Sequence, residues 1–198
     1  VDETIAFNVG YGASGLFRAI KAFEMYWHAE GMKTLYSGNV TLDGAEYRIS
    51  PEDCFGYADK NWGRNFTSPW VWLSSCNLRS RLTGKELRGS VFDIGGGCPK
   101  VYFVPLNRKL LGALCYEGQA FEFNFSKFWT GSRTQFSSEE TDAEIIWRVR
   151  QENRKAVMQT EIRCPKSEML LVKYESPDGA MRHTRLWNGG TGRGTVTL

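Results

Sequence analysis

LYSGNVTL-DG-AEYRI, which spans Leu35 to Ile49, contains the strongest turn signal in the chain. Two short strand-like runs, Leu35–Leu42 and Ala45–Ile49, flank the dipeptide Asp43-Gly44. Asp-Gly is favoured in two-residue β-hairpin turns because both central residues take positive φ there. The segment therefore predicts two antiparallel strands joined by a tight turn.

Similar runs follow at intervals of roughly 8–14 residues, which is typical of antiparallel barrels and sandwiches. Turn signals such as Glu117-Gly118 and Pro177-Asp178-Gly179 separate them. Apolar and polar residues alternate within Phe121–Phe125, as in a strand with one buried face. The further predicted strands cover residues 70–76, 101–104, 110–116, 121–125, 129–136, 144–151, 156–164, 169–174 and 182–187. We therefore expect an all-β fold, with antiparallel strands from about residue 33 to residue 198.

One segment, over about residues 13–28, is predicted to form a short N-terminal helix. Four apolar residues recur there at helical spacing, namely Leu16, Ile20, Phe23 and Trp27. Ser14 is a candidate N-cap, and Gly31 lies just beyond the expected end. This helix is expected to cover one end or face of the β-structure.

The composition excludes several classes of protein. The chain has 198 residues, 41% of them hydrophobic and 24% charged, which fits a single globular domain rather than a disordered chain. A net charge of +3 gives no electrostatic basis for binding nucleic acid. No apolar run approaches the roughly 18–20 residues of a membrane-spanning helix, so no transmembrane segment is expected.

The five cysteines are widely spaced and form no CxxC pair. Metal sites and disulfide frameworks use closer or paired spacing. We therefore expect free thiols, a cytoplasmic location with its reducing conditions, and no metal site. The cysteines are Cys54, Cys76, Cys98, Cys115 and Cys164.

The two ends of the chain suggest an excerpt from a longer protein. The first residue is Val1 rather than methionine, and Thr195–Leu198 alternates like the middle of a strand. A strand that ends within a ladder leaves backbone groups unpaired. We therefore expect further sequence on at least one side.

The segment richest in chemical function combines an acid, an amide and aromatic rings. It consists of Tyr57–Gly63 (YADKNWG), Phe66, Trp70 and Trp72. In extended backbone, Asp59 and Asn61 share one face and Lys60 points to the other. An acid beside an amide in an aromatic wall can protonate a bound apolar ligand, since burial raises the pKa of a carboxyl. Alternatively, Asp59 and Asn61 only satisfy loop backbone, and Lys60 pairs with a carboxylate.

This combination resembles the tocopherol cyclase family, whose pattern reads roughly Y-A-[DE]-K-N-W-G, then F-P, then W-x-W. The matching residues are Tyr57–Gly63, Phe66, Trp70, Trp72 and Asn77. Gly95–Gly97 and Trp187–Gly190 are weaker matches that extend the resemblance over most of the chain. Thr67 departs from the pattern, because the family usually has proline there. Family members are also much longer, which agrees with the interpretation as an excerpt.

The resemblance implies a lipocalin-like β-barrel that is one half of a two-barrel protein, with the second barrel missing from this chain. Its relatives include plant cyclases that close a chromanol ring on a prenylated quinol and, more distantly, carotenoid hydratases. These reactions protonate an alkene and capture the resulting cation. An acid, an aromatic wall and a dry pocket suffice for this step, so no metal and no organic cofactor is expected. The expected partner is a small apolar ligand, prenylated or otherwise isoprenoid.

On this basis, the candidate catalytic residues are Asp59, Lys60 and Asn61. The candidate ligand-binding residues are all aromatic, namely Tyr57, Trp62, Phe66, Trp70, Trp72 and Trp187. We expect Trp62, Trp70 and Trp72 to form part of an apolar pocket wall, with the three catalytic candidates at its polar edge.

Two other classes of function remain open. A non-catalytic carrier or sensor of a hydrophobic ligand needs only an apolar cavity with a few polar groups. A purely structural barrel would fill its interior with side chains. The position of the Asp59 carboxyl separates these readings, because a catalyst needs an acid inside the cavity.

Several other motifs are given structural interpretations. Gly95–Gly97 lacks the Lys-Ser/Thr end of a phosphate loop, so it predicts a wide turn or bulge. Gly189–Gly192 predicts a hairpin connection. His28 is expected to stabilise the C-terminus of the predicted helix, and His183 to lie with Arg185 on a solvated strand face.

Overall fold

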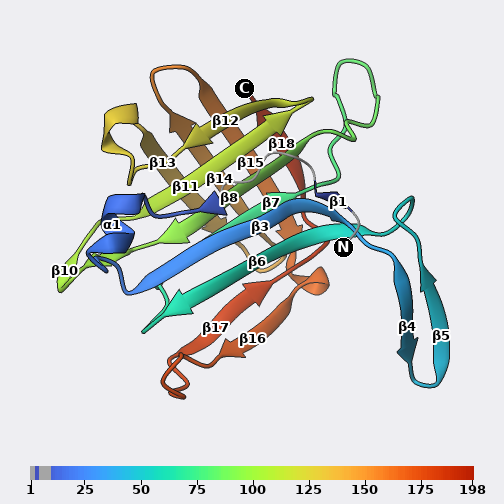
Figure 1. Cartoon of the computed structure of the whole chain (residues 1–198), viewed down its shortest axis with the longest axis horizontal. Coiled ribbons are helices and arrows are strands. Elements are labelled where there is room, and N and C mark those ends of the chain that lie inside the picture. Colours follow the sequence, from blue (N-terminus) through green and yellow to red (C-terminus); the bar gives the residue numbers. More distant parts are fainter. Residues whose placement is uncertain (1–2, 5–9) are drawn as a thin grey trace.

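Antiparallel β-strands form nearly all of the regular structure of the protein (Figure 1). The computed structural model describes residues 3–4 and 10–198. In this range the helical segments are α1 (Gly15–Ala19) and the single 3-10 turns η1 (Phe128–Thr130) and η2 (Lys166–Glu168). The all-β antiparallel class predicted from the sequence is confirmed.

The central sheet has the strand order β12-β11-β8-β7. Its strands are β7 (Val71–Ser75), β8 (Val91–Gly97), β11 (Lys109–Tyr116) and β12 (Gln119–Phe123). The β11–β12 hairpin turns at Glu117-Gly118, where φ is 44° and 88°. The predicted turn is therefore confirmed, and its geometry explains the glycine.

A second sheet is built around β3 (Met25–Leu35), which pairs with β6 (Phe55–Gly63). The short strands β1 (Glu3–Thr4) and β2 (Gly10–Tyr11) also pair with β3. Ala29 and Met32 of β3 are completely buried against three residues of the central sheet, Val91, Ala113 and Cys115. The second sheet therefore covers one face of the central sheet.

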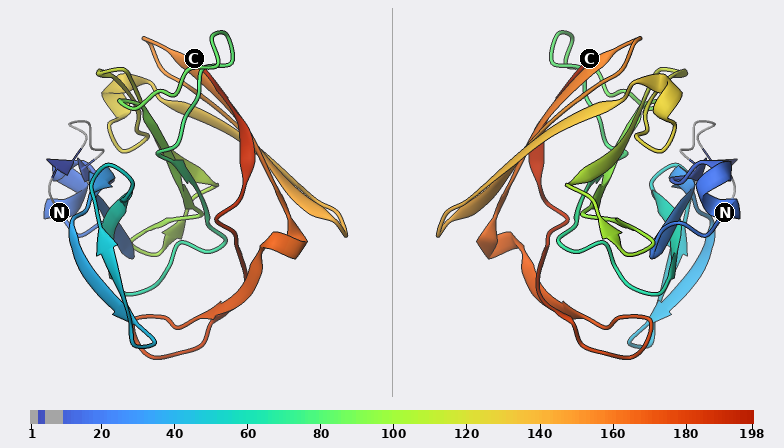
Figure 2. Two further views of the ribbon diagram at one scale, coloured as in Figure 1. Left: turned by 90° about the vertical axis from the view of Figure 1, so that its right-hand side faces the viewer. Right: turned by 90° about the vertical axis from the view of Figure 1, so that its left-hand side faces the viewer.

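A third sheet covers the opposite face and has the strand order β13-β14-β15-β18. Its strands are β13 (Arg133–Glu140), β14 (Glu144–Glu152), β15 (Val157–Pro165) and β18 (Arg193–Thr197). Val149 and Met158 pack against Phe92, Ile94 and Leu114 of the central sheet. Figure 2 shows the resulting arrangement, with the central sheet between the other two.

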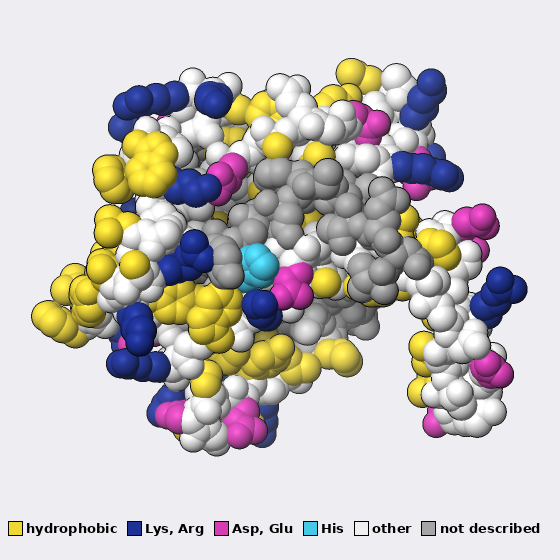
Figure 3. Space-filling view, viewed as in Figure 1, with side chains coloured by type: hydrophobic (Ala, Val, Ile, Leu, Met, Phe, Trp, Pro, Cys, Tyr) yellow, Lys and Arg dark blue, Asp and Glu magenta, His cyan; other side chains and the backbone are white. Residues whose placement is uncertain are grey.

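Three hairpins complete the fold. They are β4 (Gly38–Leu42) with β5 (Ala45–Ile49), β9 (Lys100–Val101) with β10 (Val104–Pro105), and β16 (Leu170–Tyr174) with β17 (His183–Asn188). The predicted Asp43-Gly44 turn is confirmed, with φ of 50° and 80°. The β4–β5 hairpin projects from the body of the molecule at the right of Figure 1 and Figure 3, and most of its residues are exposed.

The predicted helix over residues 13–28 is mostly wrong. α1 ends at Ala19, Lys21 has a φ of 50°, and β3 begins at Met25. The assumed apolar face is not buried, because Leu16 is 59% and Ile20 is 46% exposed. The residues from Met25 onward pair with β6 in a long antiparallel ladder, which satisfies backbone groups that a continued helix would otherwise pair.

The expected roles of the residues at the ends of that helix change accordingly. Ser14 does occupy the N-cap position, but its side chain makes no capping hydrogen bond. Gly31 and His28 both lie within β3, where His28 pairs with Lys60 of β6. His28 therefore does not stabilise a helix end.

The predicted turn or bulge at Gly95–Gly97 is also wrong, because these glycines continue β8 in regular register with β11. Their small size has a different reason. A Cβ atom on Gly97 would collide with the carbonyl oxygen of Thr67. The absence of a side chain thus allows the loop after β6 to lie directly on the end of β8, where Cys98 N donates to Thr67 O over 3.2 Å.

The connection Gly189–Gly192 joins β17 to β18, which belong to different sheets. The hairpin predicted there is therefore wrong. The physical reason is that β17 pairs back onto β16, whereas β18 pairs with β15.

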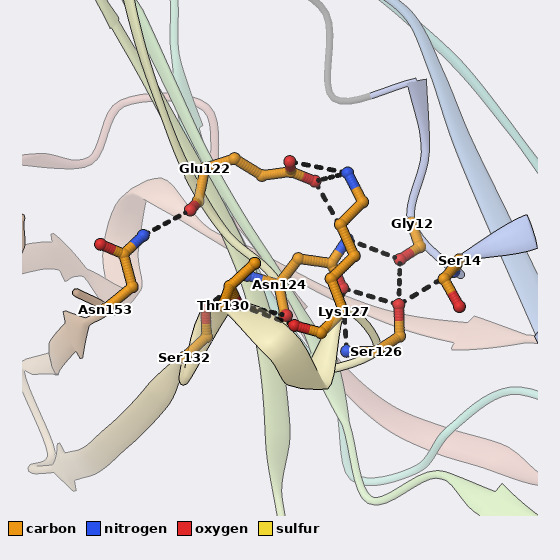
Figure 4. A network of polar contacts seen from close by, with 9 residues as sticks. All are labelled: Gly12, Ser14, Glu122, Asn124, Ser126, Lys127, Thr130, Ser132 and Asn153. Carbon is orange, nitrogen blue, oxygen red and sulfur yellow. Dashed lines mark hydrogen bonds and ion pairs between the residues drawn. The ribbon is translucent and has the colours of Figure 1, made fainter. Parts of the chain in front are cut away.

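A buried polar network fastens the segment before α1 to the loop after β12 (Figure 4). Asn124 Nδ2 donates to the carbonyl oxygen of Gly12 over 3.1 Å, and Ser126 Oγ accepts from the Ser14 backbone N–H over 2.9 Å. Ser126 Oγ also contacts Asn124 Oδ1 at 2.7 Å. Because these groups are buried, their mutual hydrogen bonds replace those they would make with water.

Three expectations stay predictions, namely the lipocalin-like barrel, its second barrel and the cytoplasmic location. Among the described residues no sheet closes on itself through its strand pairing, so the lipocalin-like barrel and its second barrel are not established. All five cysteines are free thiols, whereas the cytoplasmic location stays a prediction. Within residues 3–4 and 10–198, no helix has the length and apolar character needed to cross a membrane.

Candidate functional site

The central feature is a large cavity of about 2280 Å³. Its walls come from all three sheets and from the β16–β17 hairpin, which runs below the sheets in Figure 2. Aromatic side chains are prominent in the wall, namely Phe23, Tyr26, Trp27, Phe66, Trp70, Trp72, Phe125, Trp147, Tyr174 and Trp187. The interior is therefore not filled by side chains, as a purely structural barrel would require.

Strand β6 carries most of the predicted site and has two distinct faces. Its register with β3 places Asp59 opposite Ala29 and Asn61 opposite Trp27. Asp59, Asn61 and Trp27 all line the cavity. The alternation of a strand sends the intervening side chains to the other face.

Lys60 and Trp62 lie on that other face. Lys60 Nζ contacts Glu30 Oε1 at 2.5 Å, and the Trp62 ring stacks on Tyr26 with 5.6 Å between ring centroids. The ion pair, led by the hydrogen bond from Lys60, lowers the pKa of Glu30. The pairing of Lys60 with a carboxylate, expected under the structural alternative, is thus found.

Asp59 is held at the cavity wall by its neighbours. Trp27 Nε1 donates to Asp59 Oδ2 over 2.7 Å, and Asn61 Nδ2 approaches the same oxygen at 3.5 Å. Both donors approach the same oxygen, so neither bond uses the other carboxyl oxygen, Oδ1. The carboxyl therefore has a fixed orientation at the cavity wall. Asp59 is exposed, so the burial expected around this acid from the sequence is not found.

A second carboxyl, Asp93 on β8, lies behind the wall and was missed by the sequence analysis. Its side chain is 1% exposed, and its Oδ1 accepts a 2.9 Å hydrogen bond from Trp72 Nε1. Its Oδ2 accepts a short hydrogen bond from the Tyr57 hydroxyl. Burial raises the pKa of Asp93 to about 7, although both hydrogen bonds act in the opposite direction.

Tyr57 links the two carboxyls in space. Burial, together with the nearby charges of Asp93 and Asp59, raises the pKa of its hydroxyl above the ordinary value. Tyr57 therefore stays a neutral hydrogen-bond donor. Its ring packs against Trp72 with 5.2 Å between centroids, so it supports the wall from behind rather than lining the cavity.

Aromatic residues close the side of the cavity next to the β16–β17 hairpin. Phe66 and Trp70 stack at 5.0 Å, and Tyr174 of β16 meets Phe66 at 5.5 Å. His183 of β17 packs edge-on against Trp70 at 4.9 Å. The solvated position expected for His183 is therefore wrong, because the hairpin folds this side onto the loop after β6.

Trp187 reaches the cavity from β17. Its ring packs beside a small buried cluster of Ile145, Cys164 and Met169. Lys166 Nζ lies 5.4 Å from the ring centroid, within the range of a cation–π contact. Trp187 is thus anchored to the third sheet, on the side of the cavity away from β6.

The structure brings together part of the predicted site. Six of the predicted residues line one cavity, namely Asp59, Asn61, Phe66, Trp70, Trp72 and Trp187. Tyr57 stands behind the wall, and Lys60 and Trp62 lie on the opposite face of β6. The sequence did contain a signal for Asp93, which was not selected, because it is the one charged residue in the apolar run VFDIGGG (91–97).

No group of three or more His, Cys, Asp or Glu side chains within the described part of the chain is arranged to hold a metal ion. The polar groups at the cavity are instead single carboxyls fixed by neutral donors. Their chemistry is that of proton transfer and hydrogen bonding.

The fold and the cavity define an antiparallel β-protein with an open, aromatic-lined interior and an acid at its wall. The family profile described as Tocopherol cyclase-like matches residues 6–185. The chain belongs to this family. No curated protein matches it, and neither does any solved structure.

Proposed function

We propose that the protein binds an apolar isoprenoid ligand in the cavity and that Asp59 protonates an alkene of this ligand. The reaction is an acid-catalysed cyclisation or isomerisation. The observation that carries the proposal is the convergence of Asp59 and the rings of Trp27, Trp70 and Trp72 on one cavity.

The exposed aromatic surface of the cavity supports ligand binding. Trp72 is 53% exposed, although it occupies a sheet between two others. Covering apolar surface with a ligand contributes roughly 25 cal/mol per Å². A long hydrocarbon chain therefore gains binding free energy along the whole wall.

The chemistry of the wall supports a cationic intermediate. A tryptophan face stabilises a nearby cation by about 0.5–2 kcal/mol, with more when water is excluded. Asp59 has one oxygen held by Trp27, which leaves the other for the ligand. Asn61 adds a neutral polar group beside the acid, which orients a hydroxyl of the ligand.

For a prenylated quinol the step balances without an oxidant or reductant. The proton of the Asp59 carboxyl passes to one alkene carbon and leaves a cation on the other. The phenol oxygen then bonds to this cation, and the phenol proton returns to the carboxylate. The product is a ring-closed isomer of the substrate.

The test is turnover of a prenylated hydroquinone in D₂O. We expect a product that carries one deuterium on carbon, because protonation of the alkene is irreversible once the ring closes. Asp59→Asn should abolish the product, whereas the matched control Asp142→Asn, on an exposed turn outside the cavity, should retain it. A deuterated product from Asp59→Asn at the wild-type rate would exclude Asp59 as the acid.

A non-catalytic carrier or sensor of a hydrophobic ligand is the second candidate. It is favoured by the size of the cavity, about 2280 Å³, which exceeds the ~300–1,000 Å³ of ordinary ligand pockets. A carrier would bind the hydroquinone with a saturable change in tryptophan fluorescence and return it unchanged.

The same proposal includes the architecture of a lipocalin-like barrel, one half of a two-barrel protein. Support comes from the three sheets and the β16–β17 hairpin, which together surround the cavity. Such barrels hold one ligand in their interior. The test is to determine the structure with the hydroquinone bound. The strands should then form one closed sheet around the ligand.

A further inference from the structure

The Asp93 carboxyl is buried without a cation to balance it. Its hydrogen-bond donors, the side chains of Tyr57 and Trp72 and the backbone N–H of Ile94, are all neutral. Among the described residues, no ion pair includes Asp93. A carboxylate removed from water is costly unless it is paired. Its two oxygens accept separate bonds from Trp72 and Tyr57, and its negative charge when ionised has no ion-pair partner among the described residues.

Trp72 connects this carboxyl to the cavity. One edge of its indole donates to Asp93, and the remainder of the ring lines the cavity and is accessible there. A carboxylate behind the N–H increases the electron density of the indole ring. It also places a negative charge only one side chain away from the cavity, in a buried region of low dielectric constant where charges interact strongly.

We propose that Asp93 is the counter-charge for a positive centre held in the cavity against Trp72. The ligands that fit are an isoprenoid carbocation and, as its stable mimic, a protonated isoprenoid amine. This inference rests on the proposed function and names the group that stabilises the charge. Asp93 is thus a positioning residue that acts through Trp72, distinct from Asp59, which contacts the ligand.

The test compares two geranyl probes of similar size, one charged and one neutral. N,N-dimethylgeranylamine is cationic at pH 8, and geranyl isopropyl ether is not. Binding is followed by calorimetry for the wild type and for Asp93→Asn. We expect the wild type to bind the amine about tenfold more tightly than the ether, which corresponds to one pKa unit of interaction. Asp93→Asn should lose this preference while its affinity for the ether stays unchanged.

A second measurement on the wild type does not depend on the folding of a variant. The amine is protonated throughout pH 5.5 to 8, so any change in its affinity comes from the protein. We expect its affinity to rise about tenfold over this range as Asp93 ionises, and the affinity for the ether to stay constant. The other titratable groups that act on Asp93 are Tyr57 and Asp59 on β6. The rise should therefore persist in Asp59→Asn.

The outcomes separate the two proposals. If the ether binds neither the wild type nor any variant, the proposed function is overturned, and this inference with it. An ether that binds normally, with an amine preference that survives in Asp93→Asn, overturns the inference alone. Loss of the preference in Asp59→Asn but not in Asp93→Asn would assign the counter-charge to Asp59.

Discussion

Trp27 on β3 donates its indole N–H to the Oδ2 atom of Asp59 on β6 over a distance of 2.7 Å. The bond crosses the ladder between the two strands at the wall of the cavity. It holds one oxygen of the carboxyl, Oδ2, at the cavity wall. The orientation of the acid thus depends on a residue 32 positions earlier in the chain.

The first prediction tests this orientation. Trp27→Phe removes the donor but keeps an aromatic ring in the wall. We expect the rate of cyclisation to fall about tenfold, because a freely rotating carboxyl spends less time in the productive geometry. Trp129→Phe, on the exposed turn η1, is the control and should react like the wild type. Equal rates for Trp27→Phe and the wild type would contradict the assigned role.

The second prediction concerns the pH dependence of stability. Burial raises the pKa of Asp93 to about 7 from an ordinary value of 3.8. Between these values the folded state binds more protons than the unfolded state, so this group lowers the free energy of unfolding as the pH rises. Asp93→Asn removes that loss. Urea unfolding should therefore show the variant gaining on the wild type by an amount on the order of 3–4 kcal/mol from pH 4 to pH 8. A difference that is constant with pH would contradict the shifted pKa.

The third prediction concerns the network that fastens the segment before α1. Asn124→Ala removes the acceptor of the buried Ser126 backbone N–H and one of the two donors to the Gly12 carbonyl. Unsatisfied buried polar groups cost about 1–3 kcal/mol, so we expect a loss of about 2 kcal/mol in the free energy of unfolding. Asn39→Ala on the exposed β4 strand should change it by less than about 0.5 kcal/mol. Similar losses for both variants would show that the network adds little.

The fourth prediction compares two glycines. Gly97→Ala places a Cβ against the carbonyl oxygen of Thr67, whereas nothing lies within 4 Å of a Cβ on Gly190. We expect Gly97→Ala to lower the free energy of unfolding by about 1–3 kcal/mol, because the loop after β6 must move away from β8. Gly190→Ala should unfold close to the wild-type temperature. The contrast is measured by thermal unfolding of both variants side by side.

The fifth prediction concerns the β16–β17 hairpin. Trp70→Ala removes the ring that packs against His183 and Tyr174. We expect faster hydrogen exchange across residues 170–188, because the hairpin pairs with no other sheet in the described chain. Exchange in β14, within the third sheet, serves as the internal control and should be unchanged. Protection of the hairpin at the wild-type level would show that other contacts hold it.

Some strands were predictable because their signals are local, but β8 was not predicted, and the strand predicted over 101–104 is the turn between β9 and β10. Alternation over 144–151 and 156–164, and the turns at Asp43-Gly44 and Glu117-Gly118, correspond closely to observed elements. The helix over 13–28 was not predictable in this way. Its apolar residues fit a helical period, but Phe23, Met25 and Trp27 also fit the two-residue period of a strand, and pairing with β6 decides between them.

The site was predictable only where it follows one strand. The shared face of Asp59 and Asn61, with Lys60 on the other, follows from strand geometry alone. The hydrogen bonds of Trp27 to Asp59 and of Tyr57 and Trp72 to Asp93 join residues from different strands. These pairs depend on how two sheets stack, which no local pattern in the sequence encodes.

The β16–β17 hairpin pairs only with itself among the described residues, yet it forms one side of the cavity. Its sequence can therefore vary without breaking a ladder of the three sheets. The shape of the cavity can therefore change while the scaffold of the three sheets is maintained. Grafting this hairpin from one family member onto another should transfer the chain length of the accepted ligand while the acid on β6 is conserved in place.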